Sequence, residues 1–284
     1  MNYKYNELEY AKIIYENGLQ DHGHLPAQLR LTAIYMRRIL GYKPKKLKEE
    51  FYAWCERNIP GYQPALHYKA VNRAISQAVK KGSTLVSLPF VPVFQKELDY
   101  IHQISSISGP YEYPCRKLLF TLLVQMKANQ VVAAQRDPDR SPSGKDLFFK
   151  GGQRKYAQLK KIAALPENLR INEDLIHALY LSGLVTPMYG GMIRLDFMRE
   201  LPKDGLSQEE PCFLVEDLEH IGRYFDYYHR QPRIALCACC KRPFYKKSNS
   251  QVYCCETCYK TSNRIRSRMR MQDLRQQAVC NKGA

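Results

Sequence analysis

The sequence predicts a mainly α-helical protein with a helical N-terminal part, a middle unit of helices and one hairpin, and a small cysteine-rich C-terminal module. Three observations support this fold class. The chain has 284 residues, whereas single domains usually run to roughly 100–150 residues. Apolar residues recur at helical spacing through much of the first 185 residues. Six of the ten cysteines fall between residues 237 and 258, which indicates a separate module.

Residues 1–109 are expected to form a helical domain. Apolar stripes follow helical spacing between Leu29 and Leu40, from Phe51 to Cys55, and between Val71 and Val79. Pro26, Pro44 and Pro64 stand where these helices would begin, because the first turn of a helix leaves its N–H groups unpaired anyway. The segment 83–89 is the clear strand expected before residue 184.

Residues 110–200 are expected to form a winged-helix-like unit. An apolar helix over about 113–135 is followed by a polar loop and by two amphipathic helices, 153–165 and 172–184. Two short alternating strands around Gly190 and Gly191 then indicate a hairpin. Helix, turn, helix and hairpin is the order of a winged helix, an arrangement that also serves as scaffold or as a protein-docking surface.

The second amphipathic helix is a poor candidate for reading DNA. A recognition helix usually presents basic and amide side chains to the groove, but 172–184 offers acidic residues with His177, Tyr180 and Ser182. Phosphate contacts are therefore predicted from the helix before it and from the hairpin. The candidate residues are Arg154, Lys155, Lys160, Lys161 and Arg194.

Residues 201–229 are expected to form an acidic connecting helix. They contain two basic and seven acidic residues, whereas residues 230–284 contain thirteen basic and two acidic residues. The acidic stretch would either solvate a helix or shield the basic module from other anions.

Residues 230–284 are expected to form a zinc finger with a basic helix. Cys237 and Cys240 form a C-x2-C knuckle, and Cys254 and Cys258 are four residues apart, on one face of a first helical turn. The 13 residues between these pairs suit a hairpin. Four thiolates fill the tetrahedron of one zinc ion, which makes the site structural, and Cys255 remains an alternative to Cys254.

The helix after Cys258 carries two arginine stripes. At about 100° per residue, Arg264, Arg268 and Arg275 share one side, and Arg266 and Arg270 share the other. Ile265 and Met269 lie between the stripes, while Lys246 and Lys247 add charge nearby. Because a guanidinium donates two parallel hydrogen bonds to a phosphate, the stripes favour nucleic-acid binding over a merely solvated tail.

The residues C-x2-C-K-R-P-F, Y-C-x3-C and N-R-I-R-S-R resemble the C-terminal zinc fingers of the CGNR type and of related bacterial and prophage proteins. The resemblance covers roughly residues 234–270, and the preceding part is similar in style to proteins of Gram-positive phages and integrative elements. It implies a role in the DNA transactions of a mobile element, such as regulation or replication.

Catalytic signatures are absent from the sequence: it has no P-loop, no dinucleotide-binding glycine motif, no H-E-x-x-H and no nucleophile elbow. A nuclease could use the pairs His22 with His24 and Asp137 with Asp139, but such residues are common in polar turns. No apolar run reaches the roughly 20 residues of a membrane span, so a cytoplasmic location is expected.

The sequence therefore predicts a non-enzymatic, zinc-containing protein that binds nucleic acid, with double-stranded DNA as the expected partner. The net charge of +17 is compatible with RNA as well. A protein-interaction adaptor that docks an acidic partner through the zinc finger is the alternative from another class.

Overall fold

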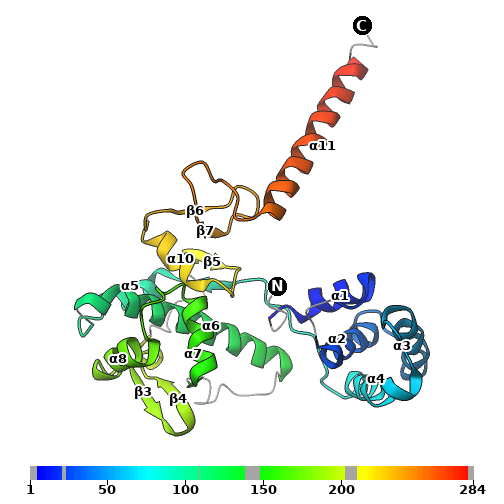
Figure 1. Ribbon diagram of the computed structural model, residues 1–284, viewed down its shortest axis with the longest axis horizontal. Coiled ribbons are helices and arrows are strands. Elements are labelled where there is room, and N and C mark those ends of the chain that lie inside the picture. The colour runs from blue at the N-terminus through cyan, green and yellow to red at the C-terminus, as the bar shows by residue number, and fades with distance from the viewer. Residues whose placement is uncertain (1–4, 21–23, 108, 138–147, 202–209, 281–284) are drawn as a thin grey trace. The chain divides into compact units, whose positions relative to one another are not determined.

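The computed structural model describes residues 5–20, 24–107, 109–137, 148–201 and 210–280, with side chains described as far as Gln272. Helices dominate these residues, which confirms the mainly α fold class (Figure 1). The chain divides into two compact units, each made of two segments. Unit 1 comprises Met1–Pro92 and Leu123–Phe149, and unit 2 comprises Val93–Leu122 and Lys150–Ala284. The sequence predicts boundaries at 109/110, 200/201 and 229/230. The division between the two compact units falls inside a long helix, α6 (Glu112–Arg136).

Unit 1 is built mainly from four helices around one apolar core. The helices are α1 (Glu7–Asn17), α2 (Leu25–Arg38), α3 (Pro44–Asn58) and α4 (Pro64–Val79). A proline stands in the first turn of α2, α3 and α4, as predicted. Ile14, Leu29, Phe51, Trp54 and Val71 are among the side chains buried between the helices.

A buried carboxylate ties the start of unit 1 together. Glu7 is 3% exposed and accepts hydrogen bonds from Arg30 at 2.6 Å, Arg136 at 3.2 Å and the backbone N–H of Val86 at 3.2 Å. The strand expected over 83–89 is wrong in extent, because only Ser87 forms a bridge, with Asn6. The strand β1 lies later, at Val91–Val93.

Unit 2 contains the remaining elements. Before the cysteine-rich module its helices are α5 (Gln95–Gln103), a 3-10 turn (Gly109–Tyr111), the first part of α6, α7 (Gln153–Ile162), a π-helical turn (Ile171–Ile176), α8 (His177–Leu181), a 3-10 turn (Tyr189–Gly191), α9 (Phe197–Glu200) and α10 (Ile221–Tyr228). Its strands are β3 (Val185–Met188), β4 (Met192–Leu195) and β5 (Phe213–Val215), and it also contains Lys150, the last residue of β2 (Phe148–Lys150). The strands β3 and β4 pair antiparallel from Val185 with Leu195 to Met188 with Met192. Together with β2 they form a sheet in the order β2-β4-β3, so the predicted hairpin is confirmed.

The acidic helix of the middle unit differs from its prediction. The segment 172–184 begins as the π-helical turn and continues as α8 only to Leu181, followed by Gly183 at φ 72°. Asp174 accepts a hydrogen bond at 2.7 Å from the backbone N–H of Arg170, the residue before the π-helical turn.

The region 201–229 is not one connecting helix in its described part. Phe213–Val215 form β5, and a helix occupies only Ile221–Tyr228. Asp217 holds the turn between them, accepting from the backbone N–H of Glu219 at 3.0 Å and contacting the His220 ring at 2.9 Å. The helix α10 approaches α7 closely because Gly222 has no side chain: a Cβ there would meet the Ala163 carbonyl oxygen at 1.9 Å.

An ion pair is buried at the centre of unit 2. Lys117 on α6 and Asp226 on α10 are 5% and 3% exposed, and their charged atoms are 2.5 Å apart. Lys117 also donates to the Ala164 carbonyl at 2.8 Å, while Asp226 accepts from Tyr113 at 2.6 Å and from Tyr245. Burial lowers the pKa of Lys117, and the Asp226 carboxylate opposes that shift. The carboxylate of Asp226 therefore organises three separate segments of the chain.

Two histidines of unit 2 share a contact that disfavours their protonation. The Nε2 atoms of His102 and His229 are 2.9 Å apart, so only one of them can carry the bridging proton. Burial, and then the proximity of His102, lower the pKa of His229 to about 4 from an ordinary value of 6.5. Burial also lowers the pKa of His102.

Unit 2 is therefore expected to lose stability in mild acid. His229 binds a proton more tightly in the unfolded chain than in the folded one. The free energy of unfolding is therefore unaffected by this residue above pH 6.5 and decreases as the pH falls from 6.5 toward about 4. The expected loss is on the order of 1–3 kcal/mol. Urea unfolding across this range measures it, and His229→Gln should flatten the pH dependence. An unchanged profile in that variant would assign the acid sensitivity to other groups.

Candidate metal centre

The first cysteine pair lies at the turn of a small hairpin. The strands β6 (Ile234–Leu236) and β7 (Pro243–Tyr245) pair antiparallel, and Cys237 and Cys240 stand in the turn between them. The turn closes through Lys241 N to Cys237 O at 2.9 Å, with Lys241 at φ 60°. The hairpin therefore carries the knuckle itself, whereas the sequence predicts a hairpin between the two cysteine pairs.

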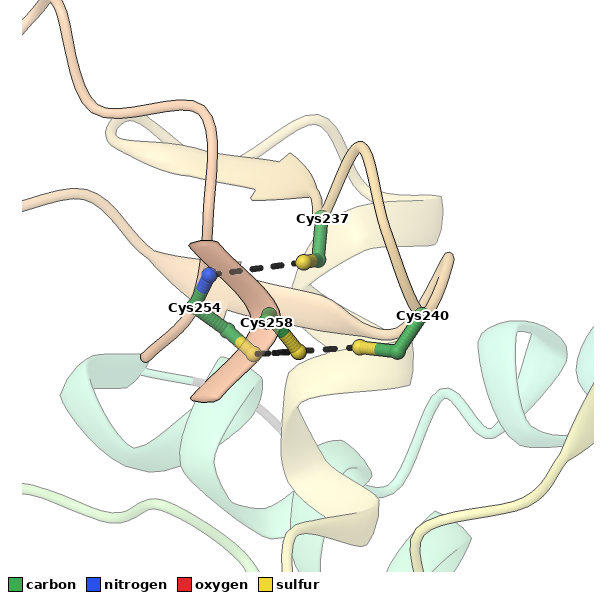
Figure 2. A group of neighbouring side chains, drawn as sticks. All are labelled: Cys237, Cys240, Cys254 and Cys258. Atoms are coloured by element: carbon green, nitrogen blue, oxygen red, sulfur yellow. Dashed lines mark hydrogen bonds between the residues drawn. The ribbon is translucent and has the colours of Figure 1, made fainter. Parts of the chain in front are cut away.

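The second pair lies at the start of a long helix, α11 (Glu256–Cys280). Cys258 is in its first turn, and Cys254 comes two residues before the helix begins, not within its first turn as predicted. The backbone N–H of Cys254 donates to the Cys237 sulfur at 3.4 Å, which joins the two halves of the module (Figure 2).

The four sulfur atoms converge on one point. Figure 2 shows the side chains of Cys237, Cys240, Cys254 and Cys258 pointing toward one another. Their Sγ atoms all lie within 4.8 Å of one another. The Sγ of Cys254 is 3.7 Å from that of Cys240 and 3.5 Å from that of Cys258. Sulfurs bound tetrahedrally at about 2.3 Å from a zinc ion would be roughly 3.8 Å apart. The cluster therefore has the donors and the size for a metal ion.

The thiols compete for protons when no cation balances their charge. Burial opposes ionisation of Cys237, but hydrogen bonds from the backbone N–H groups around it, led by that of Cys240, lower its pKa to about 6. Desolvation, with contacts to Cys237 and Cys240, raises the pKa of Cys254 to about 12, although the contact with Cys258 opposes that shift. A cation that binds all four as thiolates must displace protons, so its affinity falls in acid.

The other cysteines of the described chain stand apart from this cluster. Cys255 is exposed, and its sulfur lies 3.7 Å from Cys254 but outside the group of four. Cys239 is partly exposed within the knuckle. The sequence favours core positions for Cys55, Cys115 and Cys212. Cys55 and Cys115 are buried, and burial raises the pKa of each to about 12. The expectation is wrong for Cys212, which is exposed.

The module has little core of its own. Among the described residues after 230, the buried side chains are Cys237, Pro243 and Phe244. So small an apolar core does not stabilise an independent fold, whereas a bound structural metal contributes roughly 10–16 kcal/mol. The residues present therefore fit a structural metal ion.

The rest of unit 2 supports the module through β7. Tyr245 donates to Asp226 of α10, and the Arg223 guanidinium lies 5.9 Å from the centre of the Tyr245 ring. Arg242 pairs with Glu216 at 3.6 Å on the surface. The module is thus docked on α10, so the acidic segment before it holds Tyr245 and Arg242 in place.

Helix α11 leaves the module with its side chains exposed. Every described residue from Arg264 to Gln272 is exposed. Near the start, the Tyr253 hydroxyl contacts Ser262 at 2.9 Å and accepts from Arg266 at 2.6 Å. Among the described residues, none forms an ion pair with Arg264, Arg268 or Arg270. The side chain of Arg275 lies outside the described residues, although its backbone belongs to α11.

The other predicted basic residues differ in their availability. Exposed side chains are those of Lys247, Arg154, Lys155 and Lys161. Lys246 is partly exposed and donates to the Asn249 carbonyl at 3.2 Å, and Lys160 donates to the carbonyls of Glu167 and Leu169. Arg194 pairs with Asp196 at 2.5 Å, so its charge is already balanced.

Two features of unit 2 are not predictable from the sequence. In the sequence, Lys117 is a lysine within an apolar helix and Asp226 is an aspartate among aromatic residues. Neither context indicates that the two side chains form an ion pair. Tyr189, at the hairpin turn, is 98% exposed, and nothing in its sequence context distinguishes it from a buried tyrosine.

The described chain offers no second cluster of metal-ligating side chains of this kind. His24 and Asp137 are exposed, whereas His22 and Asp139 lie outside the described residues. None of the described helices is both long enough and apolar enough to span a bilayer. Comparison of the chain with protein-family models, with curated proteins and with solved structures finds no match.

Proposed function

We propose that this protein binds nucleic acid through the exposed basic helix α11, which a structural zinc ion anchors to the rest of unit 2. No catalytic role is assigned to the metal, because four cysteine thiolates would fill the tetrahedral coordination of zinc and leave no position for a reacting water. The expected content is one zinc per chain, held by Cys237, Cys240, Cys254 and Cys258.

The observation that carries the proposal is the exposure of the α11 arginines. The helix contains six basic and two acidic residues, and Arg264, Arg266, Arg268 and Arg270 are all exposed. Exposed guanidinium groups on a helix that packs against little else are suited to phosphates, which they bind through two parallel hydrogen bonds. Ligation of Cys254 and Cys258 by zinc would fix the first turn, which is the costly step in forming an isolated helix.

The middle of unit 2 supports the same function. The element order α6, β2, α7, α8 and the β3–β4 hairpin, with the sheet order β2-β4-β3, supports the winged-helix-like arrangement that we propose for this part of the chain. Arg154, Lys155 and Lys161 on α7 are exposed and available for phosphate contacts. Double-stranded DNA is the proposed partner, and the resemblance of the cysteine module to prophage zinc fingers suggests regulation or replication of a mobile element.

Changing Arg264, Arg268 and Arg275 together to glutamine is expected to weaken binding to duplex DNA and to reduce its dependence on salt. Each phosphate that is no longer neutralised lowers the slope of log affinity against log salt concentration by about 0.9, so the slope should fall by roughly two to three. A fluorescence-anisotropy titration across a salt series measures both quantities.

The matched control removes three exposed positive charges from unit 1, with Lys43, Lys45 and Lys48 changed to glutamine. This variant has the same net charge as the arginine variant and should keep the parental slope. Equal salt slopes for the parent and the arginine variant would mean that these arginines of α11 are solvated and do not contact phosphates.

A protein-interaction adaptor is the second candidate, favoured by one observation. Ile265 and Met269 lie between the arginine stripes and are 50% and 59% exposed, and such apolar side chains suit a protein surface better than a phosphate backbone. Substituting both with glutamine should leave DNA affinity nearly unchanged under the proposed function. The adaptor would be favoured if the parent did not bind DNA and if this double variant bound an acidic protein partner much more weakly than the parent does.

A further inference from the structure

The turn between β3 and β4 presents an aromatic side chain to solvent. Tyr189 is 98% exposed, and Met188 and Met192 on either side of the turn are 40% and 41% exposed. The turn itself relies on Gly190 and Gly191, whose φ angles of 74° and 72° lie in the left-handed region that favours glycine. The hairpin therefore holds a tyrosine at its tip, with little of the ring packed against the protein.

Two glycines fix this tip beside the start of α7. The backbone N–H of Gly151 donates to the Gly191 carbonyl at 2.8 Å. A Cβ on Gly151 would meet that same oxygen at 2.4 Å and the Tyr156 hydroxyl at 2.4 Å, so only glycine permits the approach. Because α7 begins two residues after Gly151, its first turn lies next to the hairpin tip (Figure 1).

The two segments that meet at the tip carry basic side chains and no acidic ones. Residues 148–165 and 185–195 contain no acidic residue, and Lys150, Arg154 and Lys155 are exposed. These three cations come from the end of β2 and the first turn of α7, whereas Arg194, further along β4, is balanced by Asp196. An exposed aromatic ring flanked by unbalanced cations is the combination that binds single-stranded nucleic acid, in which bases stack on aromatic side chains and cations contact the backbone.

We propose that Tyr189 stacks on an unpaired base of a nucleic acid while Lys150, Arg154 and Lys155 contact the phosphates beside that base. This inference rests on the proposed nucleic-acid binding and adds a preference for strands with unpaired bases. In an intact duplex every base face is covered by its neighbours, so Tyr189 contributes there only if a base step opens.

The test compares the parent with Tyr189→Ala on a single-stranded DNA of about 20 nucleotides and on the corresponding duplex. Alanine should weaken single-strand binding about tenfold, since one base–aromatic stack contributes a factor of this order. Duplex binding should change less than about twofold, and Tyr189→Phe should bind both like the parent. An oligonucleotide with 2-aminopurine adds a stacking signal: its fluorescence should be quenched by the parent and by Tyr189→Phe, but not by Tyr189→Ala.

Tyr68→Ala in unit 1 is the matched control, because this tyrosine is also exposed, at 60%, and lies on α4 away from the hairpin sequence. It should bind like the parent. Equal single-strand affinity of Tyr189→Ala and the parent overturns the stacking role while leaving the proposed function intact. Failure of the parent to bind either nucleic acid overturns the proposed function as well, so the two failures are distinguishable.

Discussion

Replacing Cys258 with serine is expected to release the metal and to unfold the start of α11. The loss of one thiolate breaks a four-sulfur set whose Sγ atoms lie within 4.8 Å, and zinc bound to such a set contributes roughly 10–16 kcal/mol to folding. The few buried side chains of the module, chiefly Phe244, cannot replace that contribution. Inductively coupled plasma mass spectrometry should find one zinc per parent chain and far less in the variant.

The neighbouring cysteines provide matched controls for this substitution. Cys239→Ser and Cys255→Ser remove a thiol within three residues of a ligand but outside the cluster, so both should keep a full metal content. Circular dichroism should show less helix in Cys258→Ser than in either control. Loss of zinc from Cys255→Ser with retention in Cys254→Ser would instead assign Cys255 as a ligand.

Replacing Asp226 with alanine is expected to destabilise unit 2 by about 3–5 kcal/mol, because it leaves a buried lysine without its counter-charge. Lys117 would keep only the Ala164 carbonyl at 2.8 Å and the Tyr245 hydroxyl at 3.4 Å as partners. For a unit of this size the melting temperature should fall by roughly 10 °C. Differential scanning calorimetry measures the change.

Two further variants separate the buried charge from a general effect of mutation. The double variant Lys117→Met with Asp226→Leu removes both charges together and should be more stable than Asp226→Ala alone. Glu173→Ala removes an exposed ion pair with Arg170 and should cost less than about 1 kcal/mol. If Asp226→Ala were no less stable than Glu173→Ala, the ion pair would not hold the segments together.

The elements with strong local signals were predictable from the sequence. The long apolar helix expected over 113–135 is α6, Glu112–Arg136, and the hairpin expected around Gly190 and Gly191 is β3 with β4. Regular cysteine spacing singled out the same four residues that the structure brings together. In each case the determinant lies within a few consecutive turns or strands, which is the range that sequence periodicity reports.

The features that depend on distant partners were not predictable. Lys117 and Asp226 are 109 residues apart, and no local pattern marks a charge that will be buried opposite another. The hairpin of the cysteine module was expected after the knuckle, because the pairing of Ile234–Leu236 with Pro243–Tyr245 involves strands of only three residues. The division of the chain inside α6 assigns one continuous helix to both units, and a continuous helical pattern gives no local sign of such a boundary.

The most direct test of the proposed function is a titration of the zinc-loaded full chain with a fluorescent duplex of about 20 base pairs over a salt series from about 50 to 200 mM. Polyglutamate of similar length serves as the competing acidic polymer. The exposed arginines of α11 predict micromolar or tighter binding at the lowest salt, at least tenfold weakening at the highest, and little competition by polyglutamate. Absence of binding at the lowest salt, or displacement of the duplex by polyglutamate at equal charge, would contradict nucleic-acid binding by this protein.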